Sequence, residues 1–151
     1  MSRKKKENEI DTAKDTAFRF LSYRSRSVLE VKRKLQEKEF SPHTITATLS
    51  RLMELGYLND QEYAVTVARS SIENKQWGPI RIHDALLTKR LATDIIDNTL
   101  EELTKNYDLI RVARLAFDSK FSLTPEQLAE EKTRRKVMGY LKRKGFSWNT
   151  I

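Results

Sequence analysis

The sequence predicts an all-α protein built from three tandem three-helix repeats, each similar to a helix-turn-helix unit. We expect the repeats to form an elongated, curved molecule in which the last repeat is truncated. The 151 residues include only four glycines and three prolines, and they are rich in Leu, Lys, Glu, Arg and Ala, a composition typical of helices. In addition, one pattern of apolar and capping residues occurs three times, which indicates a helical module used three times.

The repeated pattern is anchored on three leucines: Leu35, Leu86 and Leu141. Each anchor follows a Val or Ile by four residues, and it precedes a lysine by three, a Phe or Leu by five and an isoleucine by ten. Apolar residues one turn apart predict a buried stripe on each helix. The residues eight positions before the anchors are of types favoured at helix N-caps; they are Ser27, Gly78 and Thr133.

The first repeat is expected over residues 13–58, after a flexible basic tail formed by residues 1–12. Its second helix begins after Ser27, because Ser27 and Glu30 have the spacing of a capping box. Its third helix ends near Gly56, since glycine is the residue most often found just beyond a helix C-terminus.

The second repeat is expected over residues 59–106, and either Asn59 or Asp60 is expected to cap its first helix. Its second helix begins at the Gly78-Pro79 pair, because proline at the first helical position loses no hydrogen bond. The tryptophan just before this pair is expected to pack against the module in preference to stacking on nucleic acid.

The third repeat is expected over residues 107–151 and is incomplete. Thr124 and Gln127 form a second capping-box pattern, so one long helix is expected from Pro125 through Lys144. Only about one turn of the last helix can form before Ile151.

The net charge of +8 is distributed unevenly, with +4 in residues 1–60, −1 in residues 61–106 and +5 in residues 107–151. A basic surface favours polyanions or acidic protein partners, although such runs also serve as solvated faces. The candidate residues for binding a partner or DNA are Lys32, Arg33, Arg81, Lys89, Lys132, Arg134, Arg135 and Lys136.

Several classes of function lack the residues they require. There is no cysteine, and His43 and His83 stand apart from one another, so we expect no metal, no cofactor and no enzymatic activity. No apolar run reaches the roughly 18 residues of a membrane-spanning helix, so no membrane partner is expected. The charged N-terminus lacks the apolar core of a signal peptide, which suits a cytoplasmic protein. We expect a monomer.

Two motifs carry a resemblance to a known family. The stretch "ELGYLNDQEYA" at Glu54–Ala64 and the stretch "KQWGPIRIHDAL" at Lys75–Leu86 resemble the bacterial RecX family, regulators of the RecA recombinase. The chain departs from the family at Arg90, where glycine is frequent, and this difference is expected to alter the turn after the helix.

The resemblance implies a regulator that is not an enzyme. Members of the family bind RecA and the filament that RecA forms on single-stranded DNA. They mainly inhibit its ATPase, strand-exchange and co-protease activities in DNA repair and the SOS response. The alternative is a stand-alone DNA-binding protein of helix-turn-helix type, for which we expect weak, non-specific and salt-sensitive binding.

Overall fold

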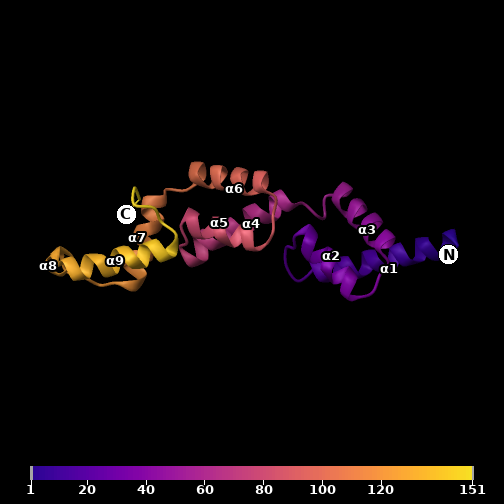
Figure 1. Ribbon diagram of the computed structural model, residues 1–151, viewed down its shortest axis with the longest axis horizontal. Helices are drawn as coiled ribbons and strands as arrows, with labels where there is room; N and C mark the ends of the chain where they lie inside the picture. Colours follow the sequence, from indigo (N-terminus) through magenta and orange to yellow (C-terminus); the bar gives the residue numbers. More distant parts are fainter. Residues whose placement is uncertain (1, 151) are drawn as a thin grey trace. The chain divides into compact units, whose positions relative to one another are not determined.

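The computed structural model describes residues 2–150, which form nine α-helices and no strand. The order of the helices along the chain can be followed in Figure 1. The predicted all-α class is therefore confirmed for the described part of the chain. The chain divides into two compact units, of which the first ends at Tyr63 and the second begins at Ala64. None of the described helices is both long enough and apolar enough to cross a membrane.

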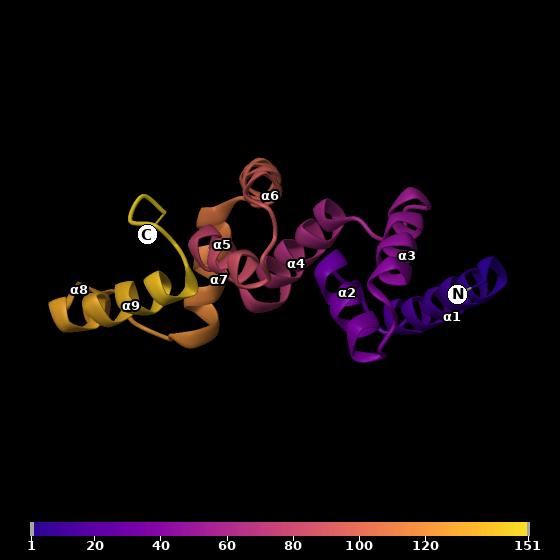
Figure 2. The ribbon, with the colours of Figure 1, turned by 45° about the vertical axis from the view of Figure 1, so that its right-hand side comes forward.

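The first unit contains three helices that pack against one another, as can be followed in Figure 2: α1 (Arg3–Leu21), α2 (Val28–Glu37) and α3 (Pro42–Glu54). Its core is formed by apolar side chains from all three helices and from the loop after α3, and these are Ala13, Ala17, Val31, Leu35, Ile45, Leu49, Leu52 and Leu58. Removal of this apolar area from water is the main contribution to the stability of the unit.

The N-terminal segment differs from the expected tail, because α1 begins at Arg3 and residues 3–12 are helical. The Ser2 side chain accepts a hydrogen bond from the Lys5 amide at 3.3 Å, and Arg3 and Glu7 form an ion pair one turn apart at 3.4 Å. The lysines and glutamates of this segment are good helix formers, so the charge that suggested a tail is compatible with a helix.

The second unit contains most of α4, which begins in the first unit, and five further helices. The bounds are α4 (Asp60–Lys75), α5 (Pro79–Thr88), α6 (Thr93–Asn106), α7 (Leu109–Lys120), α8 (Pro125–Ala129) and α9 (Glu131–Lys144). In this unit α6 packs against α5, and α9 packs against α7 and α8. The N-cap of α4 is Asn59, whose side-chain oxygen accepts hydrogen bonds from the amides of Gln61 and Glu62.

The repeated stripe is buried as predicted. Leu35 and Leu86 are 0% exposed, and Leu141 is 6% exposed. The residues one turn before them are buried as well, namely Val31, Ile82 and Val137. The isoleucine column is buried in the first two repeats, while Ile151 lies outside the described residues.

Each stripe helix ends in the same left-handed turn. The residue four positions after each anchor has a positive φ: 63° at Glu39, 57° at Arg90 and 102° at Gly145. In the first and third repeats the anchor carbonyl accepts a hydrogen bond from the amide five residues on, at 3.2 Å in both cases. Arg90 therefore adopts the left-handed backbone conformation that is typical of glycine.

The long helix expected over residues 125–144 is interrupted. Glu130 is extended, with φ −70° and ψ 129°, so α8 and α9 are separate helices and Thr133 lies inside α9 instead of at its N-cap. The predicted capping box of Thr124 and Gln127 is present. In one continuous helix Leu128 would lie about 14 Å along the axis from Val137. The break instead brings both side chains to one apolar groove of about 500 Å³ beside α7.

Candidate partner-binding surface

The start of α5 is joined to the end of α9 by backbone hydrogen bonds. The Gly78 amide donates to the carbonyl oxygen of Lys144 at 2.7 Å, and the Ile80 amide donates to that of Gly145 at 3.0 Å. No side chain caps α5. The first amides of a helix have no partner within the helix, so carbonyls from a distant part of the sequence perform the capping here.

Glycine is required on both sides of this crossing. A Cβ atom on Gly78 would overlap the backbone carbonyl of Gly145. Gly145 has a φ of 102°, and a Cβ atom there would lie 2.5 Å from the backbone nitrogen of Arg81. The sequence suggested that Gly78 serves as an N-cap, which is correct, but the close backbone approach is a second reason for glycine at this position.

The Trp77 side chain is half-buried beside this crossing and contacts two cations. The Arg81 guanidinium lies 4.2 Å from the centre of its indole ring, and the Lys75 ammonium lies 4.6 Å from it. The ammonium of Lys144 donates to the Lys75 carbonyl at 2.7 Å. Trp77 therefore packs against the module, as expected, and it also holds cationic side chains in place.

A cavity of about 440 Å³ opens between α5 and the end of α9. Its cations are Arg81 on α5 and Lys142 and Arg143 on the last turn of α9. Among the described residues, no carboxylate lies within ion-pair distance of these three side chains. The one acidic side chain of the lining, Asp84, instead lies 3.6 Å from Nδ1 of His83. We call this space, together with the side chains that line it, the α5–α9 basic cavity.

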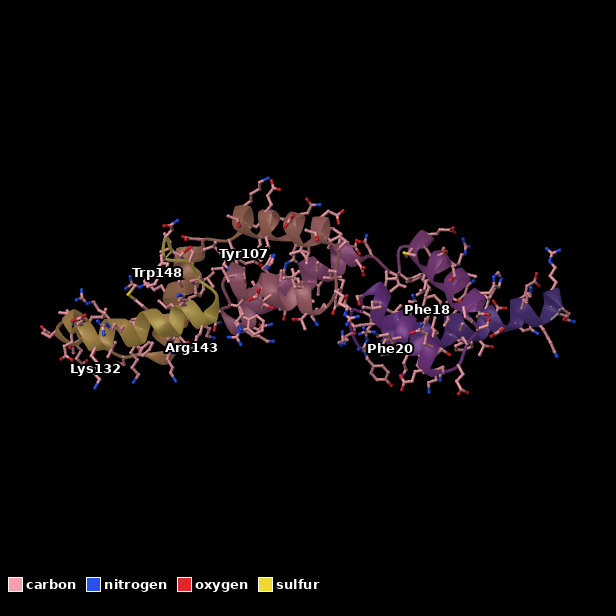
Figure 3. All side chains as sticks on the ribbon, in the orientation of Figure 1. Phe18, Phe20, Tyr107, Lys132, Arg143 and Trp148 are labelled. Carbon is pink, nitrogen blue, oxygen red and sulfur yellow. The ribbon has the colours of Figure 1, made fainter. Side chains whose placement is uncertain are left out.

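A second tryptophan lies near Lys142, one of the cations of the cavity. Trp148 follows α9 and is 62% exposed, and the Lys142 ammonium lies 5.5 Å from the centre of its ring. In Figure 3, Arg143 and Trp148 are labelled near the end of α9, and Lys132 is labelled towards its beginning. An exposed indole beside a cation is a combination common in sites for single-stranded nucleic acid.

The eight candidate residues fall into separate groups. Lys32 and Arg33 are exposed on α2 in the first unit, and Lys89 is exposed at the end of α5. The four candidates on the first half of α9 are exposed as well, and one of them, Arg135, pairs with Glu131 at 2.7 Å.

Of the candidates, only Arg81 lines the basic cavity, and it does so with Lys142 and Arg143, which were not singled out from the sequence. The signal that could have indicated them is the alignment of the third repeat, which places Gly145 beside a run of three cations.

The first unit holds a different electrostatic feature, formed around Glu30. The Arg24 guanidinium donates to the Glu30 carboxylate at 2.6 Å, and Arg26 lies 3.6 Å from it. Burial raises the pKa of Glu30, but hydrogen bonds from Arg24, Tyr63 and the Ser27 amide outweigh it and lower the value to about 2. Burial and the adjacent Glu30 raise the pKa of Tyr63 to about 12. These groups join α2 to the start of α4 and are structural.

The described residues contain no group of three or more His, Cys, Asp or Glu side chains placed to hold a metal ion. The α5–α9 basic cavity and its surroundings present cations and indoles. Such side chains recognise anions and aromatic rings.

Comparison with known proteins identifies relatives along nearly the whole chain. Models of the first and second three-helix domains of RecX match residues 13–52 and 59–100. The regulatory protein RecX of Pelodictyon phaeoclathratiforme is 32% identical over 96% of this chain and 88% of that protein. The RecX of Trichlorobacter lovleyi is 29% identical over 89% of this chain and 88% of its own length. The chain spans 54% of the RecX of Bacillus subtilis, at 32% identity.

Solved structures agree with the fold. The crystal structure of RecX from Lactobacillus salivarius superposes with a TM-score of 0.77 at 22% identity, over 95% of this chain and 92% of that one. A second crystal structure, of a regulatory protein RecX, gives a TM-score of 0.79 at 24% identity over 96% of this chain and 70% of that chain. At these identities the likeness establishes the arrangement of helices as tandem three-helix repeats.

Proposed function

This chain belongs to the RecX family of regulatory proteins, and from that membership we propose that it binds the RecA recombinase and the RecA filament on single-stranded DNA. In this proposal the protein is a cytoplasmic monomer without enzymatic activity. It mainly inhibits the ATPase, strand-exchange and co-protease activities of RecA in DNA repair.

The observation that supports this proposal most directly is the α5–α9 basic cavity of the second unit. Among the described residues, the three cations of this cavity have no carboxylate partner. Their mutual repulsion is relieved when an anion binds between them. A filament of protein on DNA offers phosphate groups and acidic side chains. The positive surface therefore suits this partner better than a neutral protein or a small apolar ligand.

The proposal can be tested by titrating this protein into RecA that hydrolyses ATP on single-stranded DNA. Because a regulator acts on the filament, we expect the rate of ATP hydrolysis to fall at substoichiometric amounts of the protein relative to RecA. An unchanged rate at a stoichiometric amount would contradict the proposal.

The same assay separates the proposal from the alternative of a stand-alone DNA-binding protein. A protein that only sequesters DNA inhibits ATP hydrolysis by removing the cofactor strand, so its effect disappears when bare single-stranded DNA is added in excess. A regulator that binds RecA in the filament retains inhibition when the ratio of protein to filament is kept constant. Inhibition that disappears with added DNA would favour the helix-turn-helix alternative.

A further inference from the structure

We propose that the α5–α9 basic cavity binds a backbone phosphate of single-stranded DNA, and that the exposed Trp148 indole stacks on a neighbouring base. The inference rests on the proposed function in one respect: the strand met in the cell is the one carried by the filament. It goes further by assigning a direct DNA contact, and by placing it on the second unit.

The cations of the cavity are available to an anion. Arg81 stacks on Trp77, and its Nη1 atom lies 3.5 Å from the Arg143 carbonyl, which leaves further guanidinium N–H groups to donate. Lys142 and Arg143 are exposed on the last turn of α9. Because the backbone amides of Gly78 and Ile80 are already bonded to carbonyls, side-chain donors form this site.

The positions of these cations are fixed by the fold. The Gly78–Gly145 crossing holds the end of α9 against the start of α5, and Trp77 restrains the Arg81 side chain. A site whose donors are held in place loses less conformational entropy on binding than one formed by free side chains. A phosphate is thus favoured here over the first half of α9, where Arg134 borders the apolar groove beside α7 and Arg135 is paired with Glu131.

The two tryptophans have different roles in this proposal. Trp77 is half-buried and already contacts Lys75 and Arg81, so it belongs to the framework of the site. Trp148 is 62% exposed and has one cation, Lys142, 5.5 Å from its ring. An exposed ring beside a phosphate-binding lysine can stack on a base of the same strand, and such stacking does not depend on the DNA sequence.

Single-stranded DNA fits this arrangement better than duplex DNA or an acidic protein. In a duplex the faces of the bases are covered by their neighbours, so Trp148 would find only groove edges and phosphates. An acidic side chain could occupy the cavity, but it would leave the indole exposed to water. The combination of cations and a free ring is what distinguishes the single strand.

The test measures binding of a fluorescent oligothymidylate of about 16 nucleotides by fluorescence anisotropy, without RecA and at low salt. The first variant, Lys142→Glu with Arg143→Glu, reverses two cations of the cavity. Its matched control, Lys132→Glu with Lys136→Glu, makes the same change of charge on exposed residues of the same helix, away from the cavity. Circular dichroism establishes that both variants remain helical, and Lys142→Gln with Arg143→Gln replaces the first if reversal unfolds it.

We expect the cavity variant to weaken binding at least about tenfold and to flatten the dependence of affinity on salt. We expect the control to weaken binding only about two- to threefold, through loss of long-range attraction. Equal losses in the two variants would show that DNA responds to net charge alone and would overturn the phosphate site. No binding by the wild-type protein at low salt would also overturn it.

The stacking contact is tested with Trp148→Ala and Trp148→Phe. Because base stacking on an aromatic side chain is lost, Trp148→Ala should weaken binding of the single strand about tenfold, while Trp148→Phe restores most of it. Neither variant should change binding to a duplex of the same length. Equal effects on both DNAs, or no effect of Trp148→Ala, would overturn the stacking contact.

The failure of this inference is distinguishable from failure of the proposed function, because the anisotropy assay contains no RecA. If the wild-type protein inhibits RecA but the cavity and Trp148 variants bind oligothymidylate normally, the regulator is established and the DNA site is wrong. If the wild-type protein binds DNA as described but leaves ATP hydrolysis unchanged, the DNA site is correct and the proposed regulation is wrong.

Discussion

The helices α2 and α5 occupy the same position in two repeats, yet their N-termini are capped by different chemistry. At α2 the caps are side chains: Ser27 accepts from the Glu30 amide at 3.1 Å, and Asp60 accepts from the Val28 amide at 2.8 Å. At α5 the caps are the backbone carbonyls of Lys144 and Gly145.

The difference teaches that one position in a repeated module can serve two purposes. The side-chain caps of α2 close its N-terminus within the first unit, and they depend on carboxylates. The carbonyl caps of α5 tie the second repeat to the third, and they require glycine because two backbones approach each other closely. The buried stripe is common to both helices, so the contrast can be tested with substitutions that act on the stripe, the caps or the turns.

The largest effect should come from the stripe, where the two helices are alike. Leu35→Ala and Leu86→Ala should each lower the free energy of unfolding by about 2–5 kcal/mol, because both leucines are fully buried and their removal leaves a cavity. Urea unfolding followed by circular dichroism measures the change. A loss under about 0.5 kcal/mol in either variant would show that the two anchors are not equivalent core residues.

Substitutions at the two N-caps should lower the free energy of unfolding by different amounts. Gly78→Ala should lower the free energy of unfolding by about 1–3 kcal/mol, because the new methyl group overlaps the Gly145 carbonyl and forces the two backbones apart. The matched variant Ser27→Ala removes only a side-chain cap and should cost about 1 kcal/mol. The same urea measurement applies, and a Gly78→Ala protein as stable as wild type would contradict the close crossing.

Of the two helix N-termini, only that of α2 is expected to contribute a stability that depends on pH. The pKa of Glu30 is lowered to about 2 in the folded protein, so its contribution to stability is present above the unfolded pKa of about 4.5 and is lost as the pH falls towards 2. Glu30→Gln should therefore reduce the difference in thermal midpoint between pH 6 and pH 3. If the thermal midpoint of the variant fell between pH 6 and pH 3 by as much as that of the wild type, other carboxylates would account for the loss of stability in acid.

The smallest effect concerns the turns that follow the stripe helices. Arg90 has a φ of 57° where the third repeat has Gly145 at 102°. A left-handed residue with a side chain costs about 1–2 kcal/mol. Glycine relieves this cost but loses about 0.5–1 kcal/mol of chain entropy, so Arg90→Gly should stabilise the protein by at most about 1.5 kcal/mol. Differential scanning calorimetry should show a raised midpoint, and Glu39→Gly should behave in the same way.

Much of the fold could be predicted from the sequence because its determinants are local. The spacing of apolar residues around Leu35, Leu86 and Leu141 depends only on helical periodicity, and the capping boxes at Ser27 and Thr124 lie within four residues. The interruption at Glu130 could not be predicted from the sequence, because no glycine or proline marks it.

The basic cavity could be predicted only in part. Arg81 can be chosen as a candidate from the sequence, because a cation in the first turn of a helix is unfavourable for the helix dipole. Its neighbours Lys142 and Arg143 lie more than 60 residues away, and the crossing that brings them together is made by backbone atoms. Backbone hydrogen bonds between distant segments leave no trace in residue types except the two glycines that permit the approach.

The carbonyl caps of α5 also bear on the order in which the chain acquires its structure during synthesis. When residues 79–88 leave the ribosome, the atoms that complete the start of this helix have not yet been made, whereas Ser27 and Glu30 are present as soon as α2 emerges. Chains generally fold from the N-terminal side as they are made. A ribosome that pauses before residue 145 would thus hold a nascent protein whose first unit is finished while α5 still has open amides.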